Sequence, residues 1–197
     1  MPLVVQPATE ADVPRAVEIE AAAYGPNQFT PILFPGPMPA NALEERAAFF
    51  VKGLREDPTT RWHKVVDTDL DGQEQTVAVV KWHIFTEKPQ FTPRAAVQGC
   101  NLEACDLVFG GLQRQRARIL GDTSYRRGAA TLLIQIVLEE AQKRGMIAYL
   151  ESSEAGHSLY KGQGFEDIEM HEVDLSKWGA TDTHKTWAMM WKPTKNS

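Results

Sequence analysis

The chain has 197 residues, of which 43% are hydrophobic and 24% are charged, and its formal net charge is −5. This length suits a single domain over residues 1–197 with a buried core. The negative charge argues against a nucleic-acid partner, and no apolar run has the length of a membrane span or the form of a signal peptide. The cysteines, Cys100 and Cys105, are too few for a disulfide framework, so we expect reduced thiols in a cytoplasmic protein.

The N-terminal third has the pattern of one strand followed by two amphipathic helices. Thr9 and Asp12 have the spacing of a capping box, and apolar residues recur at helical spacing after them. A second apolar face ends before Asp57, because the residue before a proline is disfavoured in a helix. We therefore expect a strand at residues 3–5, a helix that ends near Tyr24, and a second helix over residues 43–54.

An irregular segment lies between these helices, at residues 25–39. It contains five prolines and several large apolar residues, and prolines at this density exclude a regular helix or strand. Apolar loops of this kind often line a binding site. The same residues would also fit a loop packed onto the core. The sequence leaves both interpretations open.

Two strands are predicted at residues 61–67 and 75–85, the second rich in β-branched and aromatic residues. The intervening segment, residues 67–72, matches the opening of a calcium-binding loop. The twelfth position of that loop is Ala78, which has no carboxylate to complete the coordination. Asp-Gly between two strands is typical of a hairpin turn. We therefore expect a turn here rather than a calcium site.

A helix is predicted over residues 101–120, with a middle that is weakened by two adjacent glycines, Gly110 and Gly111. Arg114, Arg116 and Arg118 form a basic patch near its end. Charge runs usually face water, so these arginines are interpreted as solvated surface rather than as a ligand site.

The strongest local signal is the string Tyr125-Arg126-Arg127-Gly128-Ala129-Ala130-Thr131 and the helix that it opens. Apolar residues continue at helical spacing to Arg144, and Gly145 follows at a position that often adopts a left-handed conformation. Two arginines stand at the positive end of the helix dipole, which favours anions. We interpret them as ligands of a phosphate that also binds the first-turn N–H groups. The alternative is that Arg126 and Arg127 are solvated surface charges.

Acid and base side chains follow this helix. Residues 146–150 predict a buried strand that runs into Glu151-Ser152-Ser153, and a short helix containing Tyr160 comes next. A carboxylate and a phenol near a phosphate-binding helix are suited to base and acid roles, although Tyr160 would equally suit packing. The histidines stand singly, without the spacing of a zinc site, so we expect no metal. Two closing strands are predicted at residues 165–175 and 184–191.

Three motifs in a fixed order make the sequence resemble a known family. They are Tyr125-Arg126-Arg127-Gly128-Ala129-Ala130, then Tyr149-Leu150-Glu151-Ser152-Ser153, then Leu159-Tyr160-Lys161-Gly162-Gln163-Gly164-Phe165. In this combination the chain resembles the GNAT superfamily of acyl-CoA-dependent N-acyltransferases, and it looks most similar to poorly characterised fungal members. The resemblance covers essentially the whole chain.

The resemblance implies an α/β (α+β) fold with a mixed, mostly antiparallel central sheet flanked by helices. The sheet would splay near its middle, with coenzyme A in the gap. The family's pyrophosphate loop falls on residues 125–130, where Gly128 and Ala130 match and Tyr125 replaces the usual Gln or Arg. Acetyl-CoA would be the co-substrate, with cofactor-binding residues Tyr125, Arg126, Arg127, Gly128, Ala129, Ala130, Thr131, Ser153 and Tyr160.

The resemblance also implies roles in the reaction. Tyr160 falls on the family's general acid, which protonates the leaving thiolate. Ser153 stands seven positions earlier, where the family often has Asn. Glu151 is our assignment for the general base that removes a proton from the amine.

One departure from the family concerns the fourth strand, which is long and apolar in the family and runs into the pyrophosphate loop. Before Tyr125 the sequence offers only Ile119-Leu120, too short for a strand of about five or six residues. The fourth strand is therefore expected to be missing, or shortened to a stub over residues 116–122. We expect either a break near Asp122, or an edge of the strand at 75–85 that another segment or a second subunit covers.

The leading interpretation is an N-acetyltransferase that transfers an acetyl group from acetyl-CoA to a small-molecule or peptide amine by direct attack on the thioester. Residues 25–39 would form a wall of the acceptor site. Neither a nucleic acid nor a membrane is expected as a partner, and a homodimer is compatible with the sequence. The alternatives are a GNAT-like protein that binds coenzyme A or a partner without turnover, and a structural domain that binds no coenzyme A.

Overall fold

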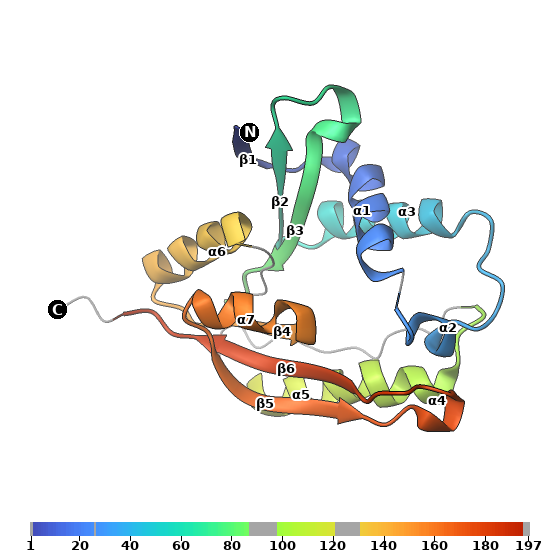
Figure 1. Ribbon diagram of the computed structural model, residues 1–197. Coiled ribbons are helices and arrows are strands. Elements are labelled where there is room, and N and C mark those ends of the chain that lie inside the picture. Colours follow the sequence, from blue (N-terminus) through green and yellow to red (C-terminus); the bar gives the residue numbers. More distant parts are fainter. Residues whose placement is uncertain (1, 26, 87–97, 121–130, 195–197) are drawn as a thin grey trace.

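The described strands of the protein form two three-stranded antiparallel sheets (Figure 1). The computed structural model describes residues 2–25, 27–86, 98–120 and 131–194. The strand order is β1-β2-β3 in the first sheet and β4-β6-β5 in the second. Helices lie beside and between the two sheets (Figure 1).

The first sheet is built from the N-terminal strand and one hairpin. Its strands are β1 (Leu3–Pro7), β2 (Thr60–Asp67) and β3 (Thr76–His83). The connection from β2 to β3 begins with a turn in which the Asp67 carboxylate accepts a hydrogen bond from the Asp69 N–H at 3.0 Å. A short 3₁₀ helix, η2 (Gly72–Gln75), completes it. The two predicted strands and the hairpin turn between them are confirmed.

The second sheet contains β4 (Ala148–Ser153), β5 (Glu166–Val173) and β6 (His184–Trp191). The last strand of the chain, β6, lies in the middle of this sheet. Helix α7 (Glu154–Gly162) connects β4 to β5, and the 3₁₀ turn η4 (Ser176–Trp178) lies between β5 and β6. Within the described ranges, β3 and β4 are each an edge strand of their sheet.

Two helices pack on the first sheet, α1 (Val13–Tyr24) and α3 (Ala42–Glu56). The predicted capping box caps a 3₁₀ turn, η1 (Glu10–Asp12), that leads into α1, and in it the Asp12 carboxylate accepts a hydrogen bond from the Thr9 N–H at 2.7 Å. Pro14 lies in the first turn, where its missing N–H has no helical partner to lose. The apolar faces of both helices meet β2 in one buried cluster, which consists of Val13, Ala16, Val17, Phe50 and Trp62.

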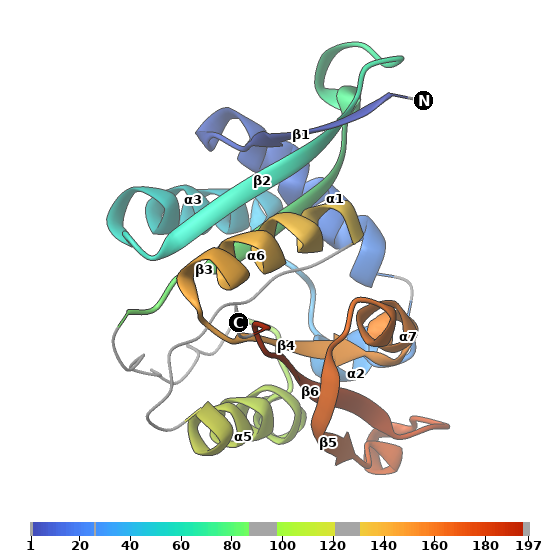
Figure 2. The same cartoon turned by 90° about the vertical axis from the view of Figure 1, so that its left-hand side faces the viewer.

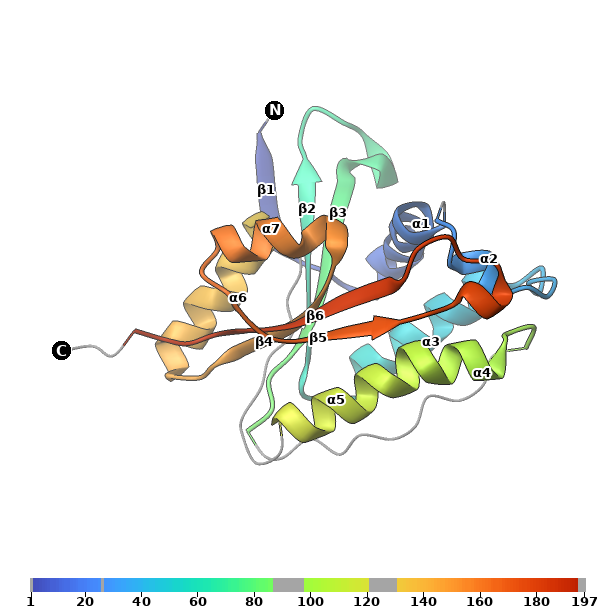
Figure 3. The same ribbon diagram turned by 60° about the horizontal axis from the view of Figure 1, so that its bottom comes forward.

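The helix predicted over residues 101–120 is present and is interrupted in its middle. It consists of α4 (Leu102–Cys105), the π-helical segment η3 (Asp106–Gly110) and α5 (Gly111–Leu120). The wider turn ends at the adjacent glycines, where the helix has its lowest intrinsic stability. Figure 3 shows α4 and α5 running along the second sheet. A further short helix, α2 (Thr30–Leu33), lies inside the irregular segment 25–39.

Helix α6 (Thr131–Arg144) packs against both sheets and lies between them in Figure 2. Leu133 and Val137 belong to a buried cluster with residues of β2 and β3. Ile134 and Ala141 belong to a second cluster with residues of β4 and β6. The helix ends as predicted, because Gly145 adopts a left-handed conformation with φ of +61°.

The described strands form two separate three-stranded sheets, whereas the resemblance implies a central sheet that splays near its middle and has a missing or shortened fourth strand. No described strand joins β3 to β4 by hydrogen bonds. Residues 116–120 belong to helix α5, so the expected strand stub is wrong at these positions. Leu, Gln, Arg and Ala dominate α5, and all four residue types favour a helix. Asp122, where a chain break was expected, lies outside the described residues, and the cover of the β3 edge stays a prediction.

The packing of α6 predicts a large loss of stability when either of its buried faces is truncated. Leu133 and Ile134 are both 0% exposed, so Leu133→Ala and Ile134→Ala should each lower the unfolding free energy by about 2–5 kcal/mol. The next residue, Gln135, is exposed, and Gln135→Ala should change that free energy by less than about 0.5 kcal/mol. Urea denaturation followed by circular dichroism measures all three variants. Losses below about 1 kcal/mol for both core variants would contradict this packing.

Candidate functional site

Strand β4 presents the predicted base on the face that carries α5. Side chains alternate along a strand, so Tyr149 and Glu151 share one face, and Leu150 and Ser152 share the other. Tyr149 belongs to a buried cluster with Leu120 of α5. Leu150 packs on the opposite side, in the cluster that includes α6. Glu151 therefore points toward α5.

Arg116 of α5 binds Glu151 through two hydrogen bonds. Its Nε donates to Glu151 Oε1 at 2.6 Å, and its Nη2 donates to Oε2 at 2.5 Å. The Tyr149 hydroxyl donates to Oε1 at 3.2 Å. The side chains of Arg116 and Glu151 are only 15% and 10% exposed. This is a buried, bidentate salt bridge, and removing one partner would leave an uncompensated buried charge.

Burial determines the protonation of the groups in this cluster. Loss of solvent raises the pKa of the Glu151 carboxyl, and the Arg116 guanidinium opposes part of that rise. Burial also raises the pKa of the Tyr149 hydroxyl, and the neighbouring Glu151 charge adds to this effect. Tyr149 therefore remains a neutral hydrogen-bond donor to Glu151 across the physiological pH range.

The interpretation of the three arginines of α5 as solvated surface is wrong for Arg116. Arg114 and Arg118 are 63% and 62% exposed and form ion pairs with Asp106 and Glu169. These two arginines are one helical turn apart and share a face, whereas a residue two positions from each lies on the opposite face. The spacing therefore contained the signal that distinguishes Arg116.

The predicted general acid, Tyr160, lies on α7, on the other side of β4. Its ring is partly buried against the cluster that contains Leu150. It meets the Phe165 ring edge-on, with centroids 6.0 Å apart. Gly156 allows this approach, because a Cβ at that position would lie 3.1 Å from a ring carbon of Tyr160.

The structure places Tyr160 and Glu151 on opposite faces of one strand rather than side by side. Glu151 contacts α5, and Tyr160 packs with the residues that face α6. Ser153 is exposed at the end of β4, directly before α7. Because β4 is an edge strand in the described ranges, the predicted base and acid flank the same sheet edge from its two sides.

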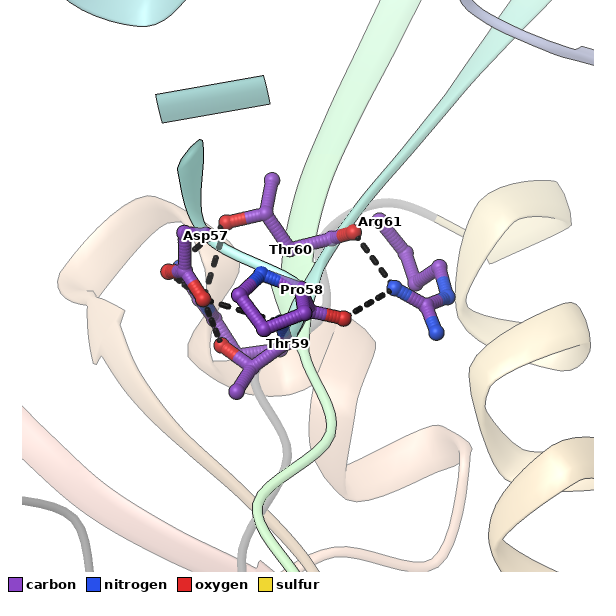
Figure 4. A network of polar contacts seen from close by, with 6 residues as sticks. Asp57, Pro58, Thr59, Thr60 and Arg61 are labelled. Carbon is purple, nitrogen blue, oxygen red and sulfur yellow. Dashed lines mark hydrogen bonds and ion pairs between the residues drawn. The ribbon is translucent and has the colours of Figure 1, made fainter. Parts of the chain in front are cut away.

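A polar turn that sequence reasoning missed leads into β2 (Figure 4). The Asp57 carboxylate accepts hydrogen bonds from the N–H and hydroxyl of Thr59 at 2.9 and 2.6 Å, and from the Thr60 hydroxyl at 3.0 Å. The Nη1 atom of Arg61 donates hydrogen bonds to the carbonyl oxygens of Pro58 and Thr60 at 2.7 and 2.8 Å. The sequence Asp-Pro-Thr-Thr was a usable signal, because Asp often bonds the backbone two residues on.

His83, at the end of β3, packs against this turn. Its Nδ1 lies 3.1 Å from Thr59 Oγ1 and 3.3 Å from Asp57 Oδ2. Its ring stacks on that of Phe85, with centroids 5.5 Å apart. Burial and the nearby Lys81 charge lower the pKa of His83 to about 4. The imidazole is therefore neutral at pH 7.

The two polar clusters approach each other on the α5 side of the sheets. Phe85, just beyond β3, packs with Leu120 of α5 and Tyr149 of β4. The positive charge of Arg116 also contributes to the lowered pKa of His83. Helix α5 therefore links the edge strand of the first sheet to the edge strand of the second.

Comparison with known proteins finds matches in three dimensions only. Neither the protein-family models nor the curated proteins searched contain a significant match to this sequence. The chain is similar to NAA60 from Arabidopsis thaliana in complex with a bisubstrate analogue, at 11% identity and a TM-score of 0.60, over 99% of this chain and 100% of that one. The complex of NAA60 with acetyl-CoA gives 12% identity and a TM-score of 0.52, over 97% of this chain and 98% of that one. An acetyltransferase of the GNAT family from Streptococcus pneumoniae gives 11% identity and a TM-score of 0.52, over 98% of this chain and 100% of that one.

The chain has the GNAT fold. This confirms the predicted fold class of antiparallel sheets flanked by helices. Identities of 11–12% establish the fold alone, and no sequence relative supports the predicted closeness to fungal members, which stays a prediction.

Most of the predicted coenzyme ligands of this GNAT fold lie outside the described residues. These are Tyr125, Arg126, Arg127, Gly128, Ala129 and Ala130. Thr131 is the first residue of α6, and its side chain is also outside the description. Among the predicted ligands, the structure therefore describes the side chains of Ser153 and Tyr160.

The segment 25–39 packs onto the second sheet's side of the fold. Leu33 is 6% exposed and belongs to a cluster with Val108 of η3 and Val173 of β5. The Phe29 ring meets the His184 ring edge-on, with centroids 5.0 Å apart. These contacts support packing onto the core for these residues, and the role of the segment as a wall of an acceptor site stays a prediction.

Three further findings concern the part of the chain that the structure describes. No three His, Cys, Asp or Glu side chains are grouped there in the way that a metal site requires. Cys100 and Cys105 are free thiols. None of the described helices combines the length and the apolar character needed to cross a membrane.

The buried His83 predicts a loss of stability in mild acid. Its ordinary pKa of 6.5 falls to about 4 in the folded protein, so the unfolded chain binds a proton more readily between these values. The stability that neutral His83 contributes is present above pH 6.5 and is lost as the pH falls toward 4. One pKa unit corresponds to about 1.4 kcal/mol, so this loss is at most about 3 kcal/mol. His83→Gln does not titrate, so its stability should fall less over the same range.

Urea denaturation at a series of pH values from about 4 to 7 tests this pH dependence, with wild type and His83→Gln compared at each pH. If both proteins lost stability with the same slope, His83 would not be the group responsible.

Proposed function

We propose that the protein is an N-acetyltransferase, which transfers the acetyl group of acetyl-CoA to a small-molecule or peptide amine by direct attack on the thioester. The observation that carries this proposal is the placement of Glu151 and Tyr160 on the two faces of the edge strand β4, within a GNAT fold. The similarity in fold to NAA60 in complex with acetyl-CoA supports the choice of co-substrate.

We place the diphosphate of the coenzyme at the start of α6. Helix α6 begins at Thr131 and has basic residues only in its last turn among those described. Its N-terminus therefore offers the positive end of a dipole to a diphosphate. Arg126 and Arg127, immediately upstream, would add charge-assisted hydrogen bonds. Acetyl-CoA, when bound, would supply an activated thioester.

In the proposed reaction, Glu151 accepts a proton from the acceptor amine as the amine nitrogen attacks the thioester carbonyl. A carbon–nitrogen bond forms, and the carbon–sulfur bond of the thioester breaks. The Tyr160 hydroxyl donates its proton to the departing thiolate. Backbone N–H groups stabilise the oxyanion that forms in between. The products are an N-acetyl amine and free coenzyme A.

A second candidate is a GNAT-like protein that binds coenzyme A, or a partner, without turnover. One observation favours it, because both carboxylate oxygens of Glu151 are hydrogen-bonded to Arg116. A carboxylate has about four lone-pair positions, however, so a bidentate guanidinium does not by itself exhaust its capacity to accept a proton. We therefore retain turnover as the leading proposal. A cytoplasmic location and a homodimer remain proposals that rest on the sequence.

Acetyl-CoA should stabilise the folded chain if it binds as proposed. At a hundred times its dissociation constant it should add about 2.7 kcal/mol to the free energy of unfolding. Thermal denaturation with and without millimolar acetyl-CoA measures the effect, with acetate as the control for an acetyl group without the nucleotide. No shift in Tm at any acetyl-CoA concentration would favour the structural alternative over both coenzyme-binding proposals.

Removing the Tyr160 hydroxyl should lower turnover and leave coenzyme binding intact. Tyr160→Phe keeps the ring that packs on Phe165 and deletes only the proton donor. General acid catalysis contributes about 10²–10⁴ in rate, so kcat should fall by that factor. Thiol release across a panel of amines gives kcat, and calorimetry gives the Kd of acetyl-CoA. A variant with wild-type turnover would show that another group, or water, protonates the thiolate.

A further inference from the structure

The ion pair of Arg116 differs from the other described ion pairs of α5 in its burial. The side chains of Arg114 and Asp106 are 63% and 66% exposed, and those of Arg118 and Glu169 are 62% and 39% exposed. Exposed pairs of this kind contribute little to stability. The Arg116–Glu151 pair is largely buried instead, so its charges are poorly screened by water or salt. Its effect on Glu151 is correspondingly strong.

The geometry of this pair fixes the orientation of the Glu151 carboxylate. The hydrogen bonds from Nε and Nη2 of Arg116, at 2.6 and 2.5 Å, go to different oxygens. A bidentate contact with a planar guanidinium restrains the carboxylate plane, which a single point charge does not do. The Tyr149 hydroxyl adds a third restraint on Oε1.

The ionisation of Glu151 also depends on its neighbours. The described titratable groups that act on it include Arg116 of α5, Tyr149 of β4 and His171 of β5. Burial favours the neutral carboxylic acid, and Arg116 is the principal group that favours the carboxylate. A general base must be deprotonated before it can accept a proton, so the positive charge of Arg116 lowers the pH at which Glu151 becomes competent.

We propose that Arg116 is a positioning residue for the acetyl transfer, which holds the Glu151 carboxylate in a fixed orientation and supplies the positive charge that stabilises its ionised form. This inference rests on the proposed function, in which Glu151 is the general base. In this role Arg116 would act on the reaction through Glu151 rather than by contact with the thioester or the amine.

The test is the pH profile of kcat/KM for one amine in four proteins. R116Q removes the charge, so the acid limb of the profile should move up by about 1–3 pH units. At pH values below the wild-type limb its activity should then be lower by about tenfold for each unit of displacement, and it should recover at high pH. R116K retains the positive charge but cannot make the bidentate contact of a guanidinium. Its acid limb should therefore stay near that of wild type while kcat falls. R118Q is the matched control, because it removes an exposed ion pair two residues along the same helix, and its profile should not change. The titration of the amine is common to all four proteins.

A second measurement gives the state of Glu151 without turnover. The ¹³C NMR signal of its carboxyl, assigned by its loss in E151Q, reports the Glu151 pKa, which should be higher in R116Q than in wild type. If no amine is acetylated, the proposed function fails, and this titration still decides whether Arg116 stabilises the ionised form of Glu151. An equal Glu151 pKa in wild type and R116Q would overturn the inference.

Two kinetic results would also overturn it. One is an R116Q profile that superimposes on that of wild type. The other is an R116Q turnover above wild type at every pH, because the contact would then inhibit the reaction rather than support it. Should R116Q fail to fold, R116K provides the test. R116K keeps the positive charge, so an acid limb moved up by about 1–3 pH units in R116K would contradict a role for that charge.

Discussion

The fold depends on one helix that packs between two sheets. Within the described ranges β3 and β4 share no backbone hydrogen bonds, and the described contacts that link the sheets are made by side chains. Leu133 and Ile134 of α6 are adjacent in sequence and belong to different clusters, one for each sheet. Adjacent helical residues point about 100° apart, so a rotation of α6 would remove apolar area from both clusters at once. This constraint fixes the N-terminus of α6, the proposed site of phosphate binding, relative to both sheets.

The elements could largely be predicted from the sequence, because each depends on local patterns. Helical periodicity and capping determine α1, α3 and α6, and alternation with turn residues determines β2 and β3. How the strands assemble is a different question. An apolar strand pattern does not specify which strand edges pair, and the central sheet with a missing or shortened fourth strand was implied by the resemblance, where the described strands form two sheets. The similarity of motifs to the GNAT superfamily supplied the correct fold class, which periodicity alone does not distinguish.

The candidate site was predicted only in part, and the missed contacts that join separate elements are long-range. Glu151 and Tyr160 could be proposed from motifs, but the partner of Glu151 is Arg116, which is 35 positions away. His83 contacts Thr59 across 24 positions. No spacing rule connects such residues. Composition alone predicts that all three arginines of α5 are exposed to solvent. Helical geometry instead places Arg116 on the face opposite Arg114 and Arg118.

The buried charges explain why α5 matters to both sheets. Loss of solvent favours the neutral forms of both His83 and Glu151, which means a lower pKa for the imidazole and a higher one for the carboxyl. The Arg116 guanidinium acts on both groups in the same electrostatic sense, since a positive charge disfavours a protonated histidine and favours a carboxylate. It therefore strengthens the effect of burial on His83 and opposes that effect on Glu151. One side chain of α5 thus contributes to the protonation equilibria of a group at the end of β3 and of a group in β4, and it couples electrostatically two edge strands that share no described hydrogen bond.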